Sequence, residues 1–499
     1  MRRIPTRSRE LLIGSALAAL VVASRSIVPL HYEHVFDSDQ AVVGLMAKHL
    51  SEFRAFPLFF YGQHYMLGVQ SWIAVPFFWI GGPTVAMLRL PLLVINVAVA
   101  VWLMAAFYRW GVRPALGFAA VLPLVATTPV TSVELMTTLG ASVEPFGYVA
   151  LLWALRRRPV AFGALLCMGA LHREFTIFAL PAVAIAERRA WRSWSPARLA
   201  QGAGAFATVW LLVNVLKLRL NVFGPSGGVY SAASAALGPQ TIISWLTFQP
   251  GAYVARLRQV ITWGVPDMLG IRSHALGPYG LPTSLEAGSR LATMAFLGAA
   301  VGALGRIAWL ARTSEARRRA DGEGVRFCVY LALIALQTIF AYGLNGGIVP
   351  ALPPVLRYVL FALLLPIALF GAYFQIDTSR RWQAAVALAA AVWGAGNLVD
   401  DARLVRALEA DPPPAHHRVM ADYLVAHGIE YGRAGYWDAY AITFLSRERA
   451  ILASTEKMRI SAYAAQVEAH ASTAVTLRRQ PCHEGTPVAA WCIIAPAAR

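Results

Sequence analysis

Two aspartates near the start of the chain are the residues best suited to chemistry. Asp37 and Asp39 lie two residues apart, shortly after a long apolar stretch. A carboxylate can remove a proton from a hydroxyl group, which typically accelerates a reaction by about 10² to 10⁴. We therefore predict Asp39 as a general base with Asp37 beside it. The structural alternative is that Asp39 caps the following helix, which would stabilise that helix by about 1 kcal/mol.

Further polar residues lie in the same segment. We predict that Gln63, His64 and Tyr65 line a cavity near the aspartates. Histidines and a glutamate in this segment make a divalent metal site conceivable, at His31, Glu33, His34, His49 and His64. No pair of them has a diagnostic ligand spacing, so no metal ligand and no required cofactor is predicted.

Arg357 is a cation where few are expected. It follows the sequence NGGIVPALPPVL and precedes Tyr358, at the outer end of an apolar stretch. A guanidinium can bind two phosphate oxygens through parallel hydrogen bonds. We predict Arg357 and Tyr358 as phosphate-binding residues. The alternatives are contact with lipid headgroups and a simple ion pair.

His172, Arg173 and Glu174 interrupt an apolar interval. Only 29 residues separate Arg158 from Arg188, whereas two full membrane crossings need about 40. The interval is predicted to form a short helical hairpin, with the three polar residues where a charge costs about 2.5 to 3.5 kcal/mol. We predict that His172 and Glu174 line a cavity and that Arg173 helps to bind phosphate. The alternative is mutual pairing that locks two helices together.

The composition shows which kind of protein must position these residues. Hydrophobic residues make up 58% of the 499 residues and charged residues 14%, against about 25% charged in soluble proteins. The mean hydropathy is +0.54. The arginines punctuate apolar runs rather than form one soluble basic face, which argues against nucleic-acid binding. With 160–186 counted as two, we predict eleven membrane segments, at 11–30, 88–107, 115–133, 144–155, 160–186, 199–217, 289–310, 326–344, 355–375 and 383–399.

The basic clusters between these runs predict their orientation. Arginines concentrate before residue 11, around 156–158 and around 312–319, and such clusters stay in the cytoplasm. The first outer loop, 31–87, and the long outer loop, 220–288, then face outward. A cleaved signal peptide is the alternative for the first run, and it leaves residue 31 outside as well.

The last hundred residues differ in character. We divide the chain into a transmembrane domain, 1–399, and an exterior C-terminal domain, 400–499, in which polar alternation predicts a small α/β fold. Cys482 and Cys492 could form a disulfide there, in agreement with an oxidising exterior. The predicted location is the bacterial cytoplasmic (inner) membrane, with the C-terminal domain outside.

Several motifs together resemble a known class. The sequence SDQA after the first run, followed by FPLFFYGQHYMLG, resembles polytopic GT-C glycosyltransferases, relatives of the dolichyl-phosphate-mannose protein mannosyltransferases and the lipid A aminoarabinose transferases. VEPFGYVALLWALRRR, with Glu144, looks like the acidic second loop of this class. LPPVLRYVL, with Arg357, looks like its phosphate-side arginine. The stretch from MADYLVAHG to RAILAS is similar to its exterior appendage.

The resemblance implies a fold and an activity. The fold would be an all-α polytopic membrane protein, GT-C-like, with a small exterior α/β domain. Such enzymes move a sugar from a polyprenyl-phosphate donor to an acceptor hydroxyl of a glycan, lipid or protein on the outer face. Asp39 matches the aspartate of the family's Asp-Glu motif, and in-line attack would invert the anomeric configuration. Gln40 stands where the glutamate is usual, so Asp37 or Glu144 would have to supply a second catalytic carboxylate.

Two other classes of function stay open at this point. Charged residues within a membrane, such as Arg173 and Glu174, are also typical of a transporter or lipid flippase, although no internal repeat is visible. An inactive scaffold that keeps the fold is the third reading, which the presence of Asp39 disfavours. A departing monophosphate needs no obligatory metal, because a preorganised arginine can stabilise its charge.

Overall fold

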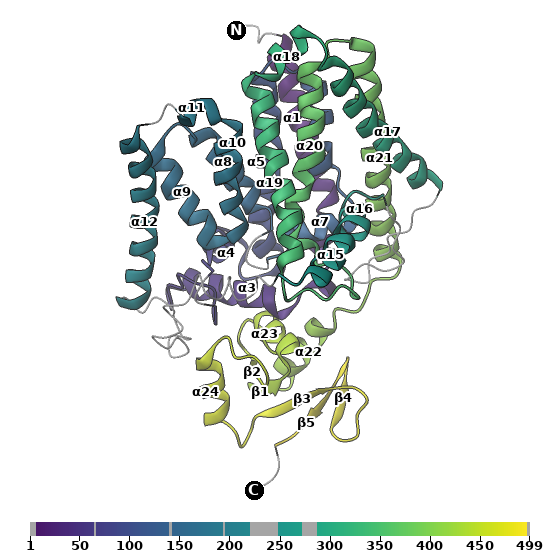
Figure 1. Cartoon of the computed structure of the whole chain (residues 1–499). Coiled ribbons are helices and arrows are strands. Elements are labelled where there is room, and N and C mark those ends of the chain that lie inside the picture. The colour runs from purple at the N-terminus through teal and green to yellow at the C-terminus, as the bar shows by residue number, and fades with distance from the viewer. Residues whose placement is uncertain are drawn as a thin grey trace, which may run out of the picture.

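The computed structural model describes residues 6–63, 66–138, 142–192, 195–219, 248–271 and 287–496. It consists of a large helical part with a small α/β domain at one end (Figure 1). The predicted cavity residues His64 and Tyr65, and most of the long outer loop 220–288, lie outside the described residues.

The helical part begins with α1 and ends with α21. Its elements up to the predicted hairpin are α1 (Thr6–Arg25), α2 (Ile27–His31), η1 (Glu33–Val35), α3 (Ser38–Ser51), α4 (Val69–Gly81), α5 (Val85–Arg109), α6 (Pro114–Val125), α7 (Pro129–Met136) and α8 (Glu144–Leu155). The hairpin region and the helix after it comprise α9 (Pro159–His172), η2 (Glu174–Phe178), α10 (Ala179–Ala186), α11 (Arg188–Arg192) and α12 (Pro196–Arg219). The remaining elements are α15 (Pro250–Gln259), η4 (Val260–Gly264), α16 (Val265–Met268), α17 (Ala287–Leu310), α18 (Ser314–Ala320), α19 (Glu323–Leu344), η5 (Leu356–Tyr358), η6 (Leu360–Leu363), α20 (Leu364–Ile376) and α21 (Arg380–Ala410).

Fewer helices are long enough to cross a membrane than the sequence predicts. Among the described residues, five helices are long and apolar enough to cross a membrane, namely α5, α12, α17, α19 and α21, and the bent pair of α6 and α7 makes a sixth. Several other predicted spans are shorter apolar helices, such as α9 and the segment Leu360–Ile376. The expected count of eleven is therefore not confirmed, because many runs are divided by breaks within the apolar sequence.

The break between α6 and α7 corrects one predicted span. We expected a continuous helix over 115–133, but the chain bends by 80° between the two helices. Pro129 disfavours the helical conformation in the residue before it, and the Thr128 hydroxyl caps α7 by accepting from the Thr131 amide. Asn397 Nδ2 donates to the freed Ala126 carbonyl at 2.8 Å. After the bend, α7 packs against α2, α5, α16, α21 and η5.

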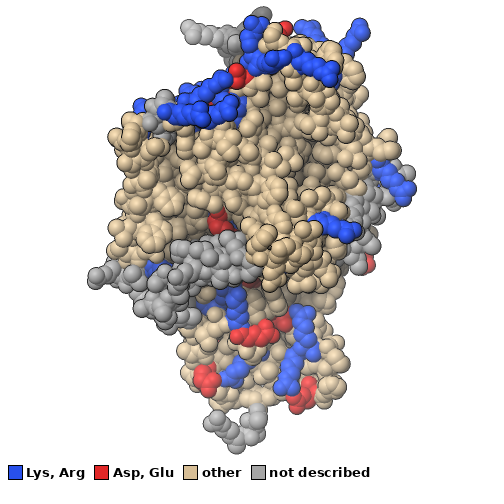
Figure 2. Space-filling view, in the orientation of Figure 1, with Lys and Arg blue, Asp and Glu red and all other residues tan. Residues whose placement is uncertain are grey.

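The predicted hairpin between Arg158 and Arg188 is present. Helix α9 ends at His172, and η2 and α10 lead the chain back. Helix α9 packs closely on α12, because a Cβ atom added at Gly163 would overlap the carbonyl oxygen of Gly202. Arg156 Nε pairs with Glu187 at 3.0 Å and thereby ties the two basic ends together. On the face shown in Figure 2, many lysines and arginines gather at the end of the helical part away from the α/β domain, as the orientation rule predicts.

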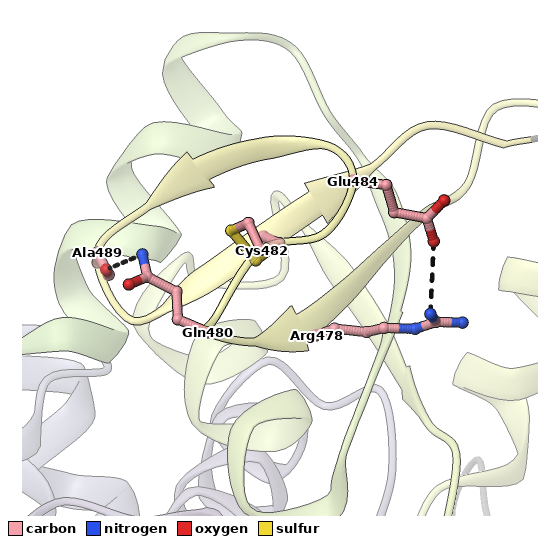
Figure 3. The surroundings of a disulfide bond; sticks show 6 residues. Arg478, Gln480, Cys482, Glu484 and Ala489 are labelled. Atoms are coloured by element: carbon pink, nitrogen blue, oxygen red, sulfur yellow. Dashed lines mark hydrogen bonds and ion pairs between the residues drawn. A yellow bond between two sulfur atoms is a disulfide. The ribbon is translucent and has the colours of Figure 1, made fainter.

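The C-terminal domain has the predicted α/β character. Its elements are α22 (His416–Ala426), β1 (Tyr431–Ala434), α23 (Tyr436–Leu445), β2 (Ile451–Ser454), α24 (Ser461–Ala469), β3 (Val475–Arg479), β4 (Thr486–Val488) and β5 (Trp491–Ile494). The strand order is β2-β1-β3-β5-β4, with β1 parallel to β2 and β3. Helix α21 continues to Ala410, past the predicted boundary at residue 400. Cys482 and Cys492 form a disulfide beside β5, near Gln480 and Glu484 (Figure 3).

Helix α3 connects the two parts of the molecule. Every residue from Ser38 to His49 except Asp39 is buried, and α3 packs against α4 and against α23 of the C-terminal domain. Its apolar side chains share one core with those of the C-terminal domain. The first outer loop and the last hundred residues therefore fold as one unit.

Candidate functional site

The start of α3 separates the roles of the two aspartates. Asp37 is the capping residue, since its Oδ1 accepts a hydrogen bond from the Gln40 amide at 3.0 Å. Burial raises the pKa of Asp37, although this hydrogen bond opposes the shift. Asp39 lies in the first turn of α3, and its side chain keeps 21% of its exposure. The structural alternative for Asp39 is thus wrong, because Asp37 provides the cap.

The C-terminal domain contributes two partners of Asp39. The Tyr436 hydroxyl donates a hydrogen bond to Asp39 Oδ1, and Arg459 Nη2 lies 3.9 Å from the same oxygen. Tyr436 and Arg459 are 4% and 2% exposed. Neither residue was predicted from the sequence. Tyr436 belongs to a run of aromatic residues after Ile429, and such residues are also typical of strands in a small α/β domain.

Gln63 lies beside the same arginine. In the amide orientation that satisfies both groups, its oxygen accepts from Arg459 Nη1 at 3.1 Å and Nη2 at 3.0 Å. The Gly62 carbonyl also accepts from Arg459 Nη1, at 3.3 Å. A Cβ atom at Gly62 would come within 2.7 Å of Arg459 Cδ, and its φ of +71° favours glycine. Gln63 is thus next to the Asp39 site through Arg459, and its place in the lining of a cavity stays a prediction.

Gln40, at the position of the family's usual glutamate, has a structural partner. Arg89 Nη2 donates to Gln40 Oε1 at 2.7 Å, and Gln40 Nε2 donates to the Val35 carbonyl at 2.7 Å. Both side chains are buried. Gln40 therefore fixes the loop before α3 and faces Arg89 without neutralising its charge.

Arg173 and Arg357 meet in one pocket, which we call the arginine pocket. Its lining consists of Ser142, Pro145, Phe146, Arg173, Phe175, Thr338, Arg357, Tyr358, Leu360 and Phe361. The guanidinium carbons of Arg173 and Arg357 lie 5.6 and 5.2 Å from the centre of the Tyr358 ring. The structure thus brings together the three residues predicted to bind phosphate. Arg173 lies between α9 and η2, and Arg357, in η5, follows it by 184 residues.

Arg173 has unused hydrogen-bonding capacity. It is 8% exposed, and its Nη2 has no hydrogen-bond partner among the described residues. A buried donor that lacks a hydrogen-bond partner costs about 1 to 3 kcal/mol. An anion in the arginine pocket would remove this penalty. The expectation that Arg173 merely pairs with His172 or Glu174 is not met by any contact within the described chain.

Arg357 acts on the charge at the start of α3. Burial raises the pKa of Asp37, and the positive charge of Arg357 opposes this shift. Among the described residues, Asp39 does not line the arginine pocket. Glu134 of α7, an acidic residue that was not predicted from the sequence, is 6% exposed.

The other predicted residues flank this arrangement. Glu144 begins α8 and accepts from the Ser142 amide at 2.8 Å through Oε2, while its buried Oε1 has no partner in the described part of the chain. His172 Nδ1 lies 3.2 Å from the Tyr148 hydroxyl, and its ring faces α8. Glu174 is partly exposed at the start of η2. Ser142 links Glu144 to the arginine pocket, whereas His172 and Glu174 are not among the described residues that line it.

No metal site is apparent within the described ranges. They contain no group of three or more His, Cys, Asp or Glu side chains placed to hold an ion. His49 is engaged with the C-terminal domain, because its Nε2 lies 3.0 Å from Glu448 Oε1. His64 lies outside the described residues.

Comparison with solved structures identifies the fold. The chain superposes on ArnT from Cupriavidus metallidurans in the apo state with a TM-score of 0.63 and 12% identity, covering 99% of each chain. It also matches the same protein bound to undecaprenyl phosphate, with a TM-score of 0.56 and 12% identity over 93% of each chain. A further match is the apo oligosaccharyltransferase of Archaeoglobus fulgidus, with a TM-score of 0.46 and 12% identity over 94% of this chain and 69% of that one.

Sequence comparison adds nothing to this likeness, since no protein-family model and no curated protein matches the chain. The structural match extends over both the helical part and the C-terminal domain. It confirms at the level of the fold what the motifs around Asp39 and Arg357 implied. The chain has the fold of ArnT.

Proposed function

We propose that the protein is a membrane glycosyltransferase that moves a sugar from a polyprenyl-phosphate donor to an acceptor hydroxyl on the outer face of the membrane. The observation that carries this proposal is the arginine pocket, in which Nη2 of the buried Arg173 has no hydrogen-bond partner among the described residues and Arg357 lies beside the same Tyr358 ring. A structure of ArnT, which has the same fold, holds undecaprenyl phosphate. A lipid phosphate is an anion that suits two arginines beside a membrane.

The proposed reaction is a single displacement. Asp39 removes the proton from the acceptor hydroxyl as its oxygen attacks the anomeric carbon of the donor sugar. The bond from that carbon to the phosphate oxygen breaks, and polyprenyl phosphate leaves with the bonding electron pair. Attack opposite the leaving group inverts the anomeric configuration. Arg357 and Arg173 stabilise the charge that develops on the phosphate, where water is scarce and a fixed cation is most effective.

Donor transfer tests this function directly. Membranes containing the protein are incubated with radiolabelled polyprenyl-phosphate sugars, one at a time, and the products are examined for transferred label. Asp39→Asn should abolish transfer and leave the melting temperature close to that of the wild type. Asp411→Asn, an exposed aspartate after α21, is the matched control and should transfer normally. Transfer by Asp39→Asn would exclude it as the base.

Arg357 has its own test. Arg357→Ala should raise the apparent KM for the donor or lower kcat, because the phosphate loses a charge-assisted partner. Wild-type values of both constants would remove Arg357 from the donor site. Movement of lipid across the bilayer without any transfer of label would instead favour the flippase.

We further propose that the protein lies in the bacterial cytoplasmic membrane with the C-terminal domain outside. The disulfide between Cys482 and Cys492 supports this orientation, because disulfides persist in oxidising compartments. Glu430→Cys provides a labelling site next to β1, while Cys167 and Cys328 are buried. A membrane-impermeant maleimide should label this variant in intact spheroplasts, and labelling only after lysis would overturn the orientation.

A further inference from the structure

Asp39 is contacted by residues of the C-terminal domain, a part of the chain that has no role in the reaction proposed above. Tyr436 lies at the start of α23 and Arg459 precedes α24, both in the C-terminal domain. Both act on the same carboxylate oxygen of Asp39, Oδ1. Within the described residues, Oδ2 has no partner and remains available to an acceptor hydroxyl.

The two partners are themselves held in place. Arg459 Nε donates to the Tyr436 hydroxyl at 3.2 Å, so the three side chains form a continuous chain of contacts. The Tyr440 hydroxyl accepts from the Arg459 amide at 2.6 Å, and the guanidinium lies 5.3 Å from the centre of the Phe60 ring. Arg459 is thus fixed at its backbone and at its tip, as a positioning group requires.

The protonation of Tyr436 fits its role as a donor. Burial and the charge of Asp39 raise the pKa of Tyr436, although Arg459 opposes the shift. The phenol therefore keeps its proton at every pH at which a carboxylate base works. Its hydrogen bond to Asp39 is available throughout the reaction.

Attachment of the C-terminal domain does not depend on these contacts. Lys48 Nζ pairs with Glu448 at 2.6 Å, and Glu33 pairs with Arg418 at 2.7 Å. Phe36 packs on Phe444 with 5.5 Å between ring centres. The domain is joined to α3 and its preceding loop at several other points, so the contacts at Asp39 have no necessary docking role.

We propose that Tyr436 and Arg459 are positioning residues that orient the Asp39 carboxylate toward the acceptor hydroxyl, so that the C-terminal domain completes the active site. The inference rests on the proposed role of Asp39. A base held by a buried tyrosine and arginine presents one oxygen in one direction, whereas a free aspartate at a helix start would sample several rotamers. Small errors in such an orientation reduce turnover by up to about 100-fold.

Tyr436→Phe in the full-length protein tests the inference, with the radiolabelled polyprenyl-phosphate sugar that the donor screen identifies. We expect kcat to fall by about 10-fold to 100-fold, with the donor KM and the affinity for undecaprenyl phosphate unchanged. A fall in kcat at unchanged donor KM is the signature of a positioning residue, because it shows that the donor still binds. Arg459→Lys should retain more activity than Arg459→Gln, since it keeps the charge.

Tyr431→Phe is the matched control, because Tyr431 stacks on His470, with 4.0 Å between ring centres, in the same domain. It should leave kcat and the donor KM unchanged. Wild-type kcat in Tyr436→Phe would overturn the inference, and a melting temperature near wild type would show that this variant is folded. If Asp39→Asn is inactive while Tyr436→Phe is normal, only this inference fails. If Asp39→Asn transfers sugar, or no donor is turned over, the proposed function fails.

Discussion

Replacement of Arg173 by methionine separates a binding role from a structural one. A guanidinium bound to phosphate makes hydrogen bonds to a charged group, each worth about 1.5 to 3 kcal/mol. Since 1.4 kcal/mol corresponds to a factor of ten, loss of a single bond should weaken binding of undecaprenyl phosphate by about 10-fold to 150-fold. The assay is a titration of the purified, full-length protein with undecaprenyl phosphate in detergent.

The same variant should not destabilise the protein without ligand. Methionine loses two cation–π contacts of Arg173, with Phe175 at 5.4 Å and Tyr358 at 5.6 Å, each worth about 0.5 to 1 kcal/mol. It also removes a buried donor, Nη2, that has no partner within the described chain and whose burial costs about 1 to 3 kcal/mol. These effects offset each other, so the melting temperature should stay at or above that of the wild type.

Arg256 provides a matched control. It is 6% exposed, but its guanidinium donates to the Ile348 carbonyl at 3.0 Å and to the Gly343 carbonyl at 3.3 Å. Arg256→Met should therefore lower the melting temperature and leave the affinity for undecaprenyl phosphate unchanged. If Arg173→Met behaves like this control, Arg173 locks helices together and the reasoning about the arginine pocket is refuted.

Three other predictions concern stability, each measured by thermal or chemical unfolding. Burial would raise the pKa of Glu448, but hydrogen bonds from His49, Lys48 and Tyr463 hold this pKa well below its ordinary value of 4.5. A depressed carboxyl pKa stabilises the fold above the ordinary pKa, and this stabilisation is lost as the pH falls. The melting temperature should therefore drop below about pH 4.5 in the wild type and less steeply in Glu448→Gln, and parallel curves for the two proteins would contradict this. Gly163→Ala should destabilise the packing of α9 on α12 by about 1 to 3 kcal/mol, whereas Gly147→Ala should not, because nothing lies within 4 Å of an added Cβ there. The double variant Cys482→Ser, Cys492→Ser should lose about 2 to 3 kcal/mol, and a reductant should lower the melting temperature of the wild type but not of this variant.

The sequence predicts those features that a local pattern determines. Helix α8 has the predicted bounds, because Pro145 suits a helix start and Arg156 opens a basic cluster at its end. Arg173 and Arg357 were identified separately, since each is a cation where apolar sequence is expected. Their meeting at Tyr358 depends on the fold of the hairpin and of the segment after α19, which no local pattern determines.

Other features depend on contacts that no local pattern reveals. The break after Val125 lies in sequence as apolar as an intact helix, and Pro129 was its only local signal. Tyr436 is 397 residues from Asp39, and its hydroxyl could equally have faced solvent or the sheet of its own domain. The burial of α3 was missed for the same reason, because its apolar face is as compatible with a lipid surface as with another domain.

The burial of α3 between the two ends of the chain has a consequence for biogenesis. Lys48 and its partner Glu448 are 400 residues apart, which at about 5 to 20 residues per second of translation is a delay of roughly 20 to 80 s. During that time the apolar segment around Met46 has emerged on one side of the membrane without its cover. A ribosome that stops before residue 436 leaves a nascent chain with an exposed, aggregation-prone helix, which makes such products natural targets for chaperones and membrane proteases.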